Sequence, residues 1–335
     1  MTTELATKPG GLRIRDLEVG LRRGGNTQPI LAGVNLEVNP GEAVGLVGES
    51  GSGKSTTARA VLGLFPERSV VSGGVEVGGR SVLDLERRAL QEFRSHEVGM
   101  IYQNPRARVN PLRKVGDFMT EAMIDSGVSR AAARQRATGL LQAVAVPDAA
   151  RRLDQYPGDL SGGLLQRVVI ATVMASGPRL VLADEPTSAL DVTTQEEVVA
   201  ILGKACQERD MALLFITHDL DLAAAVTDKV VVIYAGRVVE NLPSRLLHAH
   251  PRHPYTVGLL RSRPSLTTRE RIRTIPGTPI AAYEAGPGCV FAPRCPLATD
   301  ICLQIAPELR RVGDSVVACH NAEEVDRPNS PTEHR

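Results

Sequence analysis

The sequence predicts an α/β fold with a mostly parallel central sheet, and two observations lead to this prediction. The apolar run 43–47 has the length of a buried strand, and a glycine-rich segment and a helical pattern over 55–64 follow it directly. Apolar runs of strand length return at 180–183 and 213–216, where they would end strand–helix–strand units. The chain of 335 residues is 42% hydrophobic, which is enough for the core of one large or two ordinary domains.

Smaller elements surround this predicted core. Alternating apolar residues at 12–19 and 34–38 flank a polar loop and predict a small antiparallel β subdomain. The Ala- and Arg-rich stretch at about 111–167 has apolar residues at helical spacing and predicts a helical insertion, whose basic residues we interpret as a solvated face. Residues 251–320 are predicted to form a small C-terminal module, and 321–335 a disordered tail. The other predicted elements are strands at 74–77 and 98–102, a helix at 85–94, and a hairpin at 229–239 that turns at Ala235-Gly236.

The glycine-rich segment after the first core strand is typical of a phosphate-binding loop. It has the spacing G-x-x-x-x-G-K-[ST] and lies between a predicted strand and a predicted helix. Glycines let backbone N–H groups turn toward a polyphosphate, and the helix N-terminus adds its positive dipole end. Lys54 is predicted to reach the β and γ phosphates, and the Ser55 hydroxyl to bind Mg²⁺. The alternative is a glycine turn without a ligand. The predicted nucleotide-binding residues here are Gly48, Glu49, Ser50, Gly51, Ser52, Gly53, Lys54, Ser55 and Thr56.

Composition excludes several classes of partner. The formal net charge is +1, aromatic residues make up 3% of the chain and Trp is absent, which argues against a nucleic-acid-binding surface. No apolar run approaches the roughly 18 to 20 residues that cross a bilayer, and the N-terminal residues lack the apolar core of a signal peptide. We therefore expect the protein to remain in the cytoplasm and to reach any membrane through a partner.

The predicted strand at 180–183 is followed by two acidic residues. A phosphate-binding loop needs an acidic partner, and Asp184 would supply it by holding the Mg²⁺ shell. Glu185 is placed to polarise a water for in-line attack on the γ-phosphate. An apolar strand that ends in two acids is a weak signal alone, but together with the loop it predicts nucleotide hydrolysis.

With these features, further motifs make the chain resemble the ATP-binding subunit of an ABC transporter, whose core is a P-loop NTPase (RecA-like) fold. The resemblance covers nearly the whole chain and implies a nucleotide-binding domain over 1–250. A single Gln is better interpreted as a surface amide, and a single His as a core residue. The resemblance therefore rests on the occurrence of all the motifs in the order that the family shows. The motifs are Gln103 as the Q-loop glutamine, Leu160-Ser161-Gly162-Gly163 as the signature, Ser188-Ala189-Leu190-Asp191 as the D-loop and His218 as the switch histidine.

The resemblance implies that two such domains work head to tail, with ATP between the loop of one and the signature of the other. Ser161, Gly162 and Gly163 would contact the γ-phosphate held by the partner, and Asp191 would also belong to the ATP site. Glu185, His218 and Gln103 are the predicted catalytic residues, and Ser55, Gln103 and Asp184 the predicted Mg²⁺ ligands. The implied partners are a second ABC ATPase subunit, two transmembrane permease subunits and an external substrate-binding protein. The chain would lie on the cytoplasmic face of the membrane as a peripheral subunit.

Two positions depart from the family pattern. Leu164 in the signature stands where the family usually has a polar residue or Met, which would weaken the partner's site without abolishing it. The family stacks adenine on an aromatic residue upstream of the loop, but no Phe, Tyr, Trp or His precedes Phe65. Leu21, Arg22 or Arg23 would have to contact the base instead, which predicts weak discrimination between ATP and GTP.

The C-terminal module narrows the resemblance to the oligopeptide and dipeptide importer ATPases. The residues that carry it are His253-Pro254-Tyr255-Thr256, Ile275-Pro276-Gly277, Gly288-Cys289-Val290-Phe291-Ala292-Pro293-Arg294-Cys295-Pro296, Cys302 and Ala318-Cys319-His320. In those relatives four cysteines resemble ligands of a 4Fe–4S cluster, which implies Cys289, Cys295, Cys302 and Cys319 here. Zn²⁺ and free thiols stay open as alternatives, although no C-x-x-C pair is present. We interpret the nearby His248, His250 and His253 as part of a hinge rather than a metal tract.

The predicted function is ATP hydrolysis that powers import of short peptides. The same module resembles subunits that import nickel or metal chelates, so that substrate class stays open. A non-transport ABC ATPase is the alternative of another class. The chromosome type needs long coiled coils between Lys54 and Asp184, and the segment between these residues is too short for them. The ribosome type needs two cassettes in one chain, and this sequence has one. A binding module without hydrolysis is disfavoured by Glu185 and His218.

Overall fold

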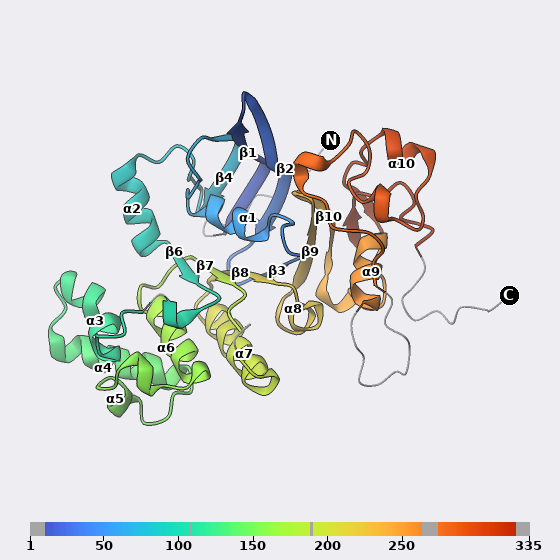
Figure 1. The fold of residues 1–335 in the computed structure, drawn as a ribbon. Coiled ribbons are helices and arrows are strands. Elements are labelled where there is room, and N and C mark those ends of the chain that lie inside the picture. Colours follow the sequence, from blue (N-terminus) through green and yellow to red (C-terminus); the bar gives the residue numbers. More distant parts are fainter. Residues whose placement is uncertain (1–10, 108, 188–189, 263–273, 326–335) are drawn as a thin grey trace. The chain divides into compact units, whose positions relative to one another are not determined.

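A computed structural model describes residues 11–107, 109–187, 190–262 and 274–325 of the chain. Strands and helices alternate over about 43–101 and 162–234, as the α/β prediction requires, and consecutive helices lie between these two stretches (Figure 1). The chain divides into two compact units. The first comprises Met1–Leu12, Val38–Ala43 and Glu76–Phe215, and the second comprises Arg13–Glu37, Val44–Val75 and Ile216–Arg335.

The first unit contains the strands that lead to the predicted acidic residues. β6 (Val98–Ile101), β7 (Leu180–Asp184) and β8 (Ala212–Thr217) are neighbours in the order β8-β7-β6. β6 and β7 run parallel, with Ile101 opposite Ala183. All of β8 and the first four residues of β7 are buried, which explains why these strands are continuous apolar runs without alternation.

Helices make up most of the rest of the first unit. α3, α4 and α6 pack on one another, and they include the predicted helical insertion, although α6 extends past it to Ala175. Arg130, Arg134 and Arg136 are exposed, and Arg134 pairs with Asp154 at 2.5 Å, so the basic residues do form a solvated face. The helices of this unit are α2 (Arg87–His96), α3 (Val115–Asp125), α4 (Arg130–Ala143), α5 (Ala149–Arg152), α6 (Gly162–Ala175) and α7 (Val192–Glu208).

The second unit is built on a sheet with the order β11-β12-β10-β9-β3. β3 pairs parallel with β9, and β9 pairs antiparallel with β10. The predicted hairpin turn is present: Ala235 and Gly236 both have positive φ, 46° and 73°, as a two-residue turn between twisted strands requires. The strands are β3 (Ala43–Val47), β9 (Lys229–Tyr234), β10 (Arg237–Pro243), β11 (Arg310–Val312) and β12 (Ser315–Val317).

A second sheet in the same unit has the order β2-β1-β4. Its strands are β1 (Leu12–Arg23), β2 (Asn26–Val38) and β4 (Ser69–Val77). Within the first unit, Glu76 and Val77 at the end of β4 pair antiparallel with β5 (Arg80–Ser81). β2 begins at Asn26 and not at residue 34 as predicted, because the loop predicted between the two strands shrinks to a turn at Gly24 and Gly25. The unit's first two helices are α1 (Lys54–Val61) and α8 (Leu220–Val226).

The C-terminal residues join the core of the second unit. They contribute α9 (Pro254–Arg261), α10 (Asp300–Gln304) and the last two strands, and β12 pairs antiparallel with β10, with Val317 opposite Glu240. The disordered tail predicted over 321–335 is contradicted for residues 321–325, since Ala322 and Val325 are buried. Residues 326–335 lie outside the described part of the chain.

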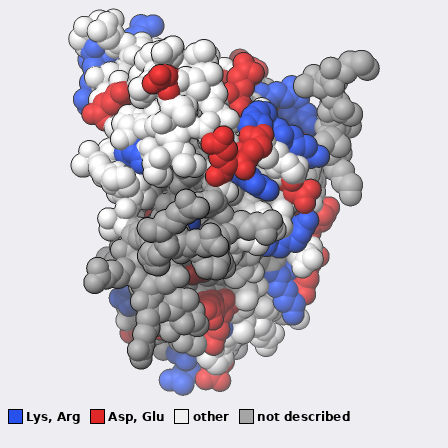
Figure 2. All heavy atoms as spheres, turned by 90° about the vertical axis from the view of Figure 1, so that its right-hand side faces the viewer, with Lys and Arg blue, Asp and Glu red and all other residues white. Residues whose placement is uncertain are grey.

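Charged side chains of both signs are present on the face of the molecule that Figure 2 shows. On the face that Figure 2 shows, basic and acidic side chains are intermixed and do not gather into one large patch of a single sign. Within the described residues, no helix combines the length and apolar character that spanning a membrane requires.

Candidate nucleotide site

The phosphate loop of the second unit connects β3 to α1, in the predicted strand–loop–helix order. Gly53, the residue before α1, has φ of 110°, and a Cβ there would lie 2.6 Å from Leu31 Cδ2. At Gly48 a Cβ would meet the Ile233 carbonyl oxygen at 2.2 Å. Both positions therefore need glycine, because backbone or core atoms occupy the space of a side chain.

Lys54 is folded back over the loop. Its ammonium group donates to the carbonyl oxygens of Gly48 at 2.7 Å and Glu49 at 2.9 Å, and only 7% of the residue is exposed. A compact positive charge is thus held inside the loop that should receive the phosphates. An anion there would interact with the ammonium more strongly than a neutral carbonyl oxygen does.

The buried hydroxyl of Ser52 shows whether the loop is suited to a phosphate. Its hydroxyl is buried, and no hydrogen-bond partner for it is found within the described part of the chain. Its carbonyl oxygen accepts from the Gly236 N–H at 2.9 Å, so the hairpin turn of β9 and β10 fixes the backbone of the loop. A buried hydroxyl without a partner is costly, and a phosphate oxygen in the loop would satisfy it.

In the first unit the structure brings Gln103 and Glu185 together. Gln103 follows β6 and Glu185 follows β7, so the pair lies at the carboxyl ends of two parallel neighbours. The Gln103 amide nitrogen donates to Glu185 Oε2 at 3.1 Å. Since this bond uses the nitrogen, it does not use the amide oxygen that a Mg²⁺ ligand would need.

Glu185 has an unusual backbone. Its φ is 46°, in the left-handed region that a residue with a Cβ rarely occupies. Such a conformation costs about 1–3 kcal/mol and persists where surrounding structure imposes it, often at catalytic positions. Asp184, one residue earlier, ends the strand itself and is half-buried.

The signature and the D-loop aspartate also lie together in the first unit. The Ser161 hydroxyl caps α6 by accepting from the Leu164 N–H at 3.3 Å, and Asp191 caps α7 by accepting from the Thr194 N–H at 3.0 Å. A Cβ on Gly163 would lie 2.5 Å from Thr194 Cγ2. These segments line a cavity of about 480 Å³. Its lining includes Ser161, Gly162, Gly163, Leu164, Leu190 and Asp191.

The remaining predicted residues are placed less completely. His218 follows β8 and belongs to the second unit, next to Asp219, which caps α8. Ser188 and Ala189 of the predicted D-loop lie outside the described residues. Arg22 and Arg23, predicted to contact the base, are exposed at the end of β1, and their role stays a prediction.

Comparison with known proteins agrees with this geometry. The family described as "ABC transporter" matches residues 31–188, and the family described as "Oligopeptide/dipeptide transporter, C-terminal region" matches residues 239–302. The oligopeptide transport ATP-binding protein OppD of Salmonella typhimurium is 39% identical over 298 residues, which cover 88% of this chain and 89% of the relative. The chain belongs to the ATP-binding proteins of oligopeptide/dipeptide ABC transporters.

Other relatives support the same family. OppD of Mycobacterium bovis is 43% identical over 93% of this chain, but the match covers only 52% of that protein, so this ABC chain spans about half the length of its mycobacterial relatives. An ATP-binding cassette solved as a dimer in a post-hydrolysis state with ADP and Pi is 28% identical, with a TM-score of 0.62 over 70% of this chain and 99% of the cassette. The predicted P-loop NTPase cassette fold is thereby confirmed.

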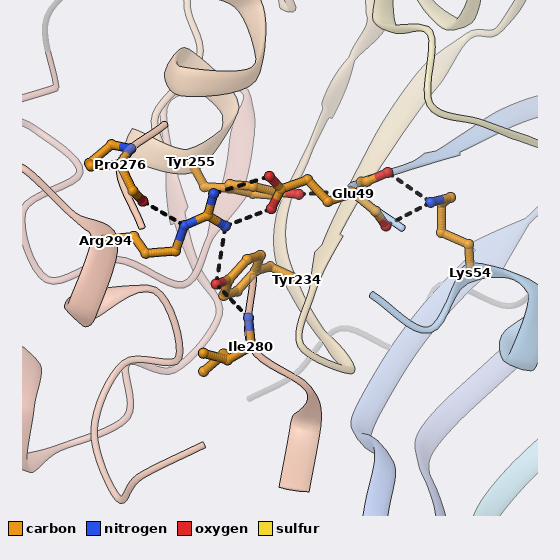
Figure 3. Close-up of polar contacts among 8 residues, drawn as sticks. Glu49, Lys54, Tyr234, Tyr255, Pro276, Ile280 and Arg294 are labelled. Carbon is orange, nitrogen blue, oxygen red and sulfur yellow. Dashed lines mark hydrogen bonds and ion pairs between the residues drawn. The ribbon is translucent and has the colours of Figure 1, made fainter. Parts of the chain in front are cut away.

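The structure adds residues to this ABC site that the sequence motifs do not assign. The Glu49 N–H donates to the Tyr255 hydroxyl at 2.8 Å, and the Glu49 carboxylate pairs with Arg294 (Figure 3). Tyr255 and Arg294 lie 206 and 245 residues further along the chain, so no local pattern connects them to the loop. Both lie in the C-terminal segments that carried the family resemblance, which was the one signal available.

The C-terminal cysteines of this ABC protein are close enough for one thiol to change the pKa of another. Burial raises the pKa of Cys295 to about 11 and of Cys319 to about 12, and the other C-terminal thiols raise the pKa of Cys319 further. Cys302 is buried and Cys289 half-buried, and all four are free of disulfides. Among the residues that the structure describes, however, no three His, Cys, Asp or Glu side chains are arranged to hold a metal ion. The described geometry therefore shows neither the predicted 4Fe–4S cluster nor a Zn²⁺ site, and both stay predictions.

Proposed function

We propose that this chain is the ATP-hydrolysing subunit of an ABC importer for oligopeptides or dipeptides. The observation that carries the proposal is the Gln103–Glu185 pair at the ends of β6 and β7, in a chain that also holds Lys54 inside a phosphate loop. Names of the relatives, which refer to oligopeptide transport and peptide import, support the choice of substrate.

The loop would bind the phosphates of ATP. Lys54 would bind β- and γ-phosphate oxygens in place of the carbonyl oxygens of Gly48 and Glu49, and the Ser52 hydroxyl would gain the partner it lacks within the described residues. Backbone N–H groups between Gly48 and Ser55 would complete the cradle at the start of α1.

Hydrolysis would depend on Glu185. Its carboxylate would accept a proton from the attacking water, and the bond from Gln103 holds that carboxylate in place. Ser55, Asp184 and Gln103 offer a hydroxyl, a carboxylate and an amide oxygen, which suits Mg²⁺ because that ion prefers oxygen ligands. Bound Mg²⁺ would neutralise charge on the β and γ phosphates. His218 would contact the γ-phosphate.

The active form would be a dimer with a second ABC ATPase, identical or homologous. Ser161, Gly162 and Gly163 start α6 and line the open cavity beside Asp191, where they would meet the γ-phosphate of the partner's ATP. The related cassette solved with ADP and Pi is itself a dimer, which supports this arrangement. Opening and closing of the dimer would be transmitted to two permease subunits on the cytoplasmic face of the membrane.

Substitution of the proposed base tests the enzymatic part of this proposal. Glu185→Gln should abolish ATP hydrolysis and leave an ATP-bound dimer that is stable enough to detect by gel filtration or light scattering. Glu208→Gln, which removes an exposed carboxylate at the end of α7, should hydrolyse ATP at the original rate. Unchanged hydrolysis in Glu185→Gln would remove Glu185 as the base.

A transport assay tests the substrate. Membrane vesicles that contain the chain with its permeases and binding protein should take up a labelled tri- or tetrapeptide when ATP is supplied. Uptake of a nickel chelate without peptide uptake would instead support the metal-import alternative.

We further propose that Cys289, Cys295, Cys302 and Cys319 bind a 4Fe–4S cluster with a structural role. Four soft thiols, two buried and two half-buried, lie close enough to raise the pKa of Cys319, which supports this. The ligands of such a cluster bind different iron atoms, so they need not surround a single ion. An anaerobically purified protein should be brown and contain iron. A colourless, iron-free and active protein would exclude the cluster, and a zinc content of one per chain would favour Zn²⁺.

A further inference from the structure

Arg294 reaches from the C-terminal segment into the phosphate loop. Its guanidinium donates two hydrogen bonds to the Glu49 carboxylate, Nη1 to Oε2 at 2.7 Å and Nη2 to Oε1 at 3.1 Å (Figure 3). The Arg294 side chain is 4% exposed and that of Glu49 24%. A two-bond pair with so little solvent fixes both the position and the orientation of the carboxylate.

Other contacts hold Arg294 itself in place. Its Nε donates to the Pro276 carbonyl oxygen at 2.9 Å, and Nη1 also donates to the Tyr234 hydroxyl at 3.3 Å. The guanidinium lies 5.7 Å from the centre of the Tyr234 ring and 5.9 Å from that of Phe291. These contacts fix the position of the Arg294 guanidinium, and the guanidinium in turn fixes the position of the Glu49 carboxylate.

Glu49 is also held through its backbone. Its N–H donates to the Tyr255 hydroxyl at 2.8 Å, and its carbonyl oxygen accepts from Lys54 at 2.9 Å. Burial raises the pKa of Tyr255, so the hydroxyl stays protonated at neutral pH. One residue of the loop thus receives contacts from Arg294, Tyr255 and Lys54.

Charge gives this arrangement a consequence for binding. Glu49 follows Gly48 in the loop, and its carboxylate, if unpaired, would repel a triphosphate that carries several negative charges. Arg294 pairs with that charge inside a region of low solvent exposure, where electrostatic interactions are strongest.

We infer that Arg294 is a positioning residue for ATP binding: it neutralises and orients Glu49, so that the phosphate loop accepts a triphosphate. The inference deepens the proposed function and rests on it, since it concerns the same ATP site. Arg294 does not touch the nucleotide and acts only through Glu49.

The test compares the affinity of the full-length chain for MgATP with that of its variants. Arg294→Met should raise the Kd for MgATP about tenfold, because removal of the arginine leaves a charged carboxylate unpaired beside the phosphates. Arg294→Met with Glu49→Gln should restore the Kd to within about threefold of the original value, because the unpaired charge is then gone. Arg294→Lys keeps the charge but not the two-bond geometry, and it should give an intermediate Kd.

A matched control separates positioning from general stability. Arg310 pairs with Glu323 through two bonds of 2.6 and 2.7 Å in the same C-terminal region, and neither residue belongs to the loop. Arg310→Met should leave the Kd for MgATP unchanged. The inference is overturned if Arg294→Met binds MgATP as tightly as the original chain.

It is equally overturned if the Glu49→Gln substitution fails to restore binding, because Arg294 would then have only a structural role. If Arg294→Met does not fold, the Arg294→Lys variant decides by the same comparison of Kd values. A parallel measurement of ATP hydrolysis keeps the two proposals apart. If the original chain binds MgATP but does not hydrolyse it, the proposed function is refuted. The role of Arg294 in binding is still decided by the Kd values of the variants.

Discussion

Replacing Glu240 by Gln should change how the stability of the protein depends on pH. Glu240 lies in β10, is fully buried, and accepts hydrogen bonds from the backbone N–H groups of Arg252 at 2.5 Å and His253 at 3.1 Å. Burial raises the pKa of its carboxyl from 4.5 to about 7, although these bonds act in the opposite direction. The folded protein therefore keeps the proton of Glu240 at pH values where the unfolded chain has lost it.

The sign of the effect follows from this difference. Between pH 4.5 and 7 the folded state binds more protons at Glu240 than the unfolded state does, so the free energy of unfolding falls as pH rises. At 1.36 kcal/mol for each pKa unit, the loss is about 3 kcal/mol and levels off once the pH has risen past 7. The stabilising contribution is complete only below pH 4.5, where both states are protonated.

His253 has the opposite effect and must be separated from Glu240. Burial lowers the pKa of His253 from 6.5 to about 3, so the protein loses stability as pH falls below 6.5. Urea unfolding of the original chain and of Glu240→Gln from pH 5 to 8 isolates the glutamate, because His253 is present in both. The free energy of Glu240→Gln minus that of the original chain should rise by about 2–3 kcal/mol across this range.

The informative quantity is the change with pH of this difference in the free energy of unfolding. Its value at a single pH also contains the effect of the amide on the hydrogen bonds from Arg252 and His253. Glu308→Gln removes an exposed carboxylate and serves as the control for the loss of a surface charge. If the difference for Glu240→Gln stays constant within about 1 kcal/mol, the argument from burial is wrong.

Three further predictions concern the core and the loop. Gly53→Ala should lower stability by about 2 kcal/mol and weaken MgATP binding, because φ is 110° and the new methyl group meets Leu31; urea unfolding and nucleotide titration check this. Phe291→Leu should cost about 2 kcal/mol in urea unfolding, because the ring packs on Tyr234 and Tyr255 at centroid distances of 5.4 and 5.2 Å, and a change below about 0.5 kcal/mol would contradict this. MgATP and MgGTP should bind with similar Kd values, as no aromatic residue precedes Phe65 to stack on the base, and a strong preference for ATP would refute this.

Features that depend on neighbouring residues could be predicted from the sequence. The phosphate loop, the two acids at the end of β7 and the hairpin at Ala235-Gly236 all follow from short patterns of glycine, apolar and acidic residues. The early start of β2 was missed because Thr27, Gln28 and Pro29 interrupt the alternation that marks a strand.

Features that depend on distant residues could not be predicted in this way. The pairing of β12 with β10 and the contact between Arg294 and Glu49 join segments far apart in the chain, and no periodicity specifies such partners. The positive φ of Glu185 is imposed by its surroundings against the preference of the residue itself. At the candidate site, the sequence therefore identified the residues of each motif, but not the distant residues that fix their positions.

The hairpin between β9 and β10 limits where this protein can be modified. Two-residue turns at the tip of a hairpin are ordinarily good places to insert a tag or a fluorescent domain. Here Ala235 and Gly236 are buried, the Gly236 N–H donates to Ser52 in the phosphate loop, and its carbonyl oxygen accepts from Ala32 in β2. An insertion at this turn would separate the loop from its support, so reporters for this subunit belong elsewhere, such as the exposed Gly24-Gly25 turn.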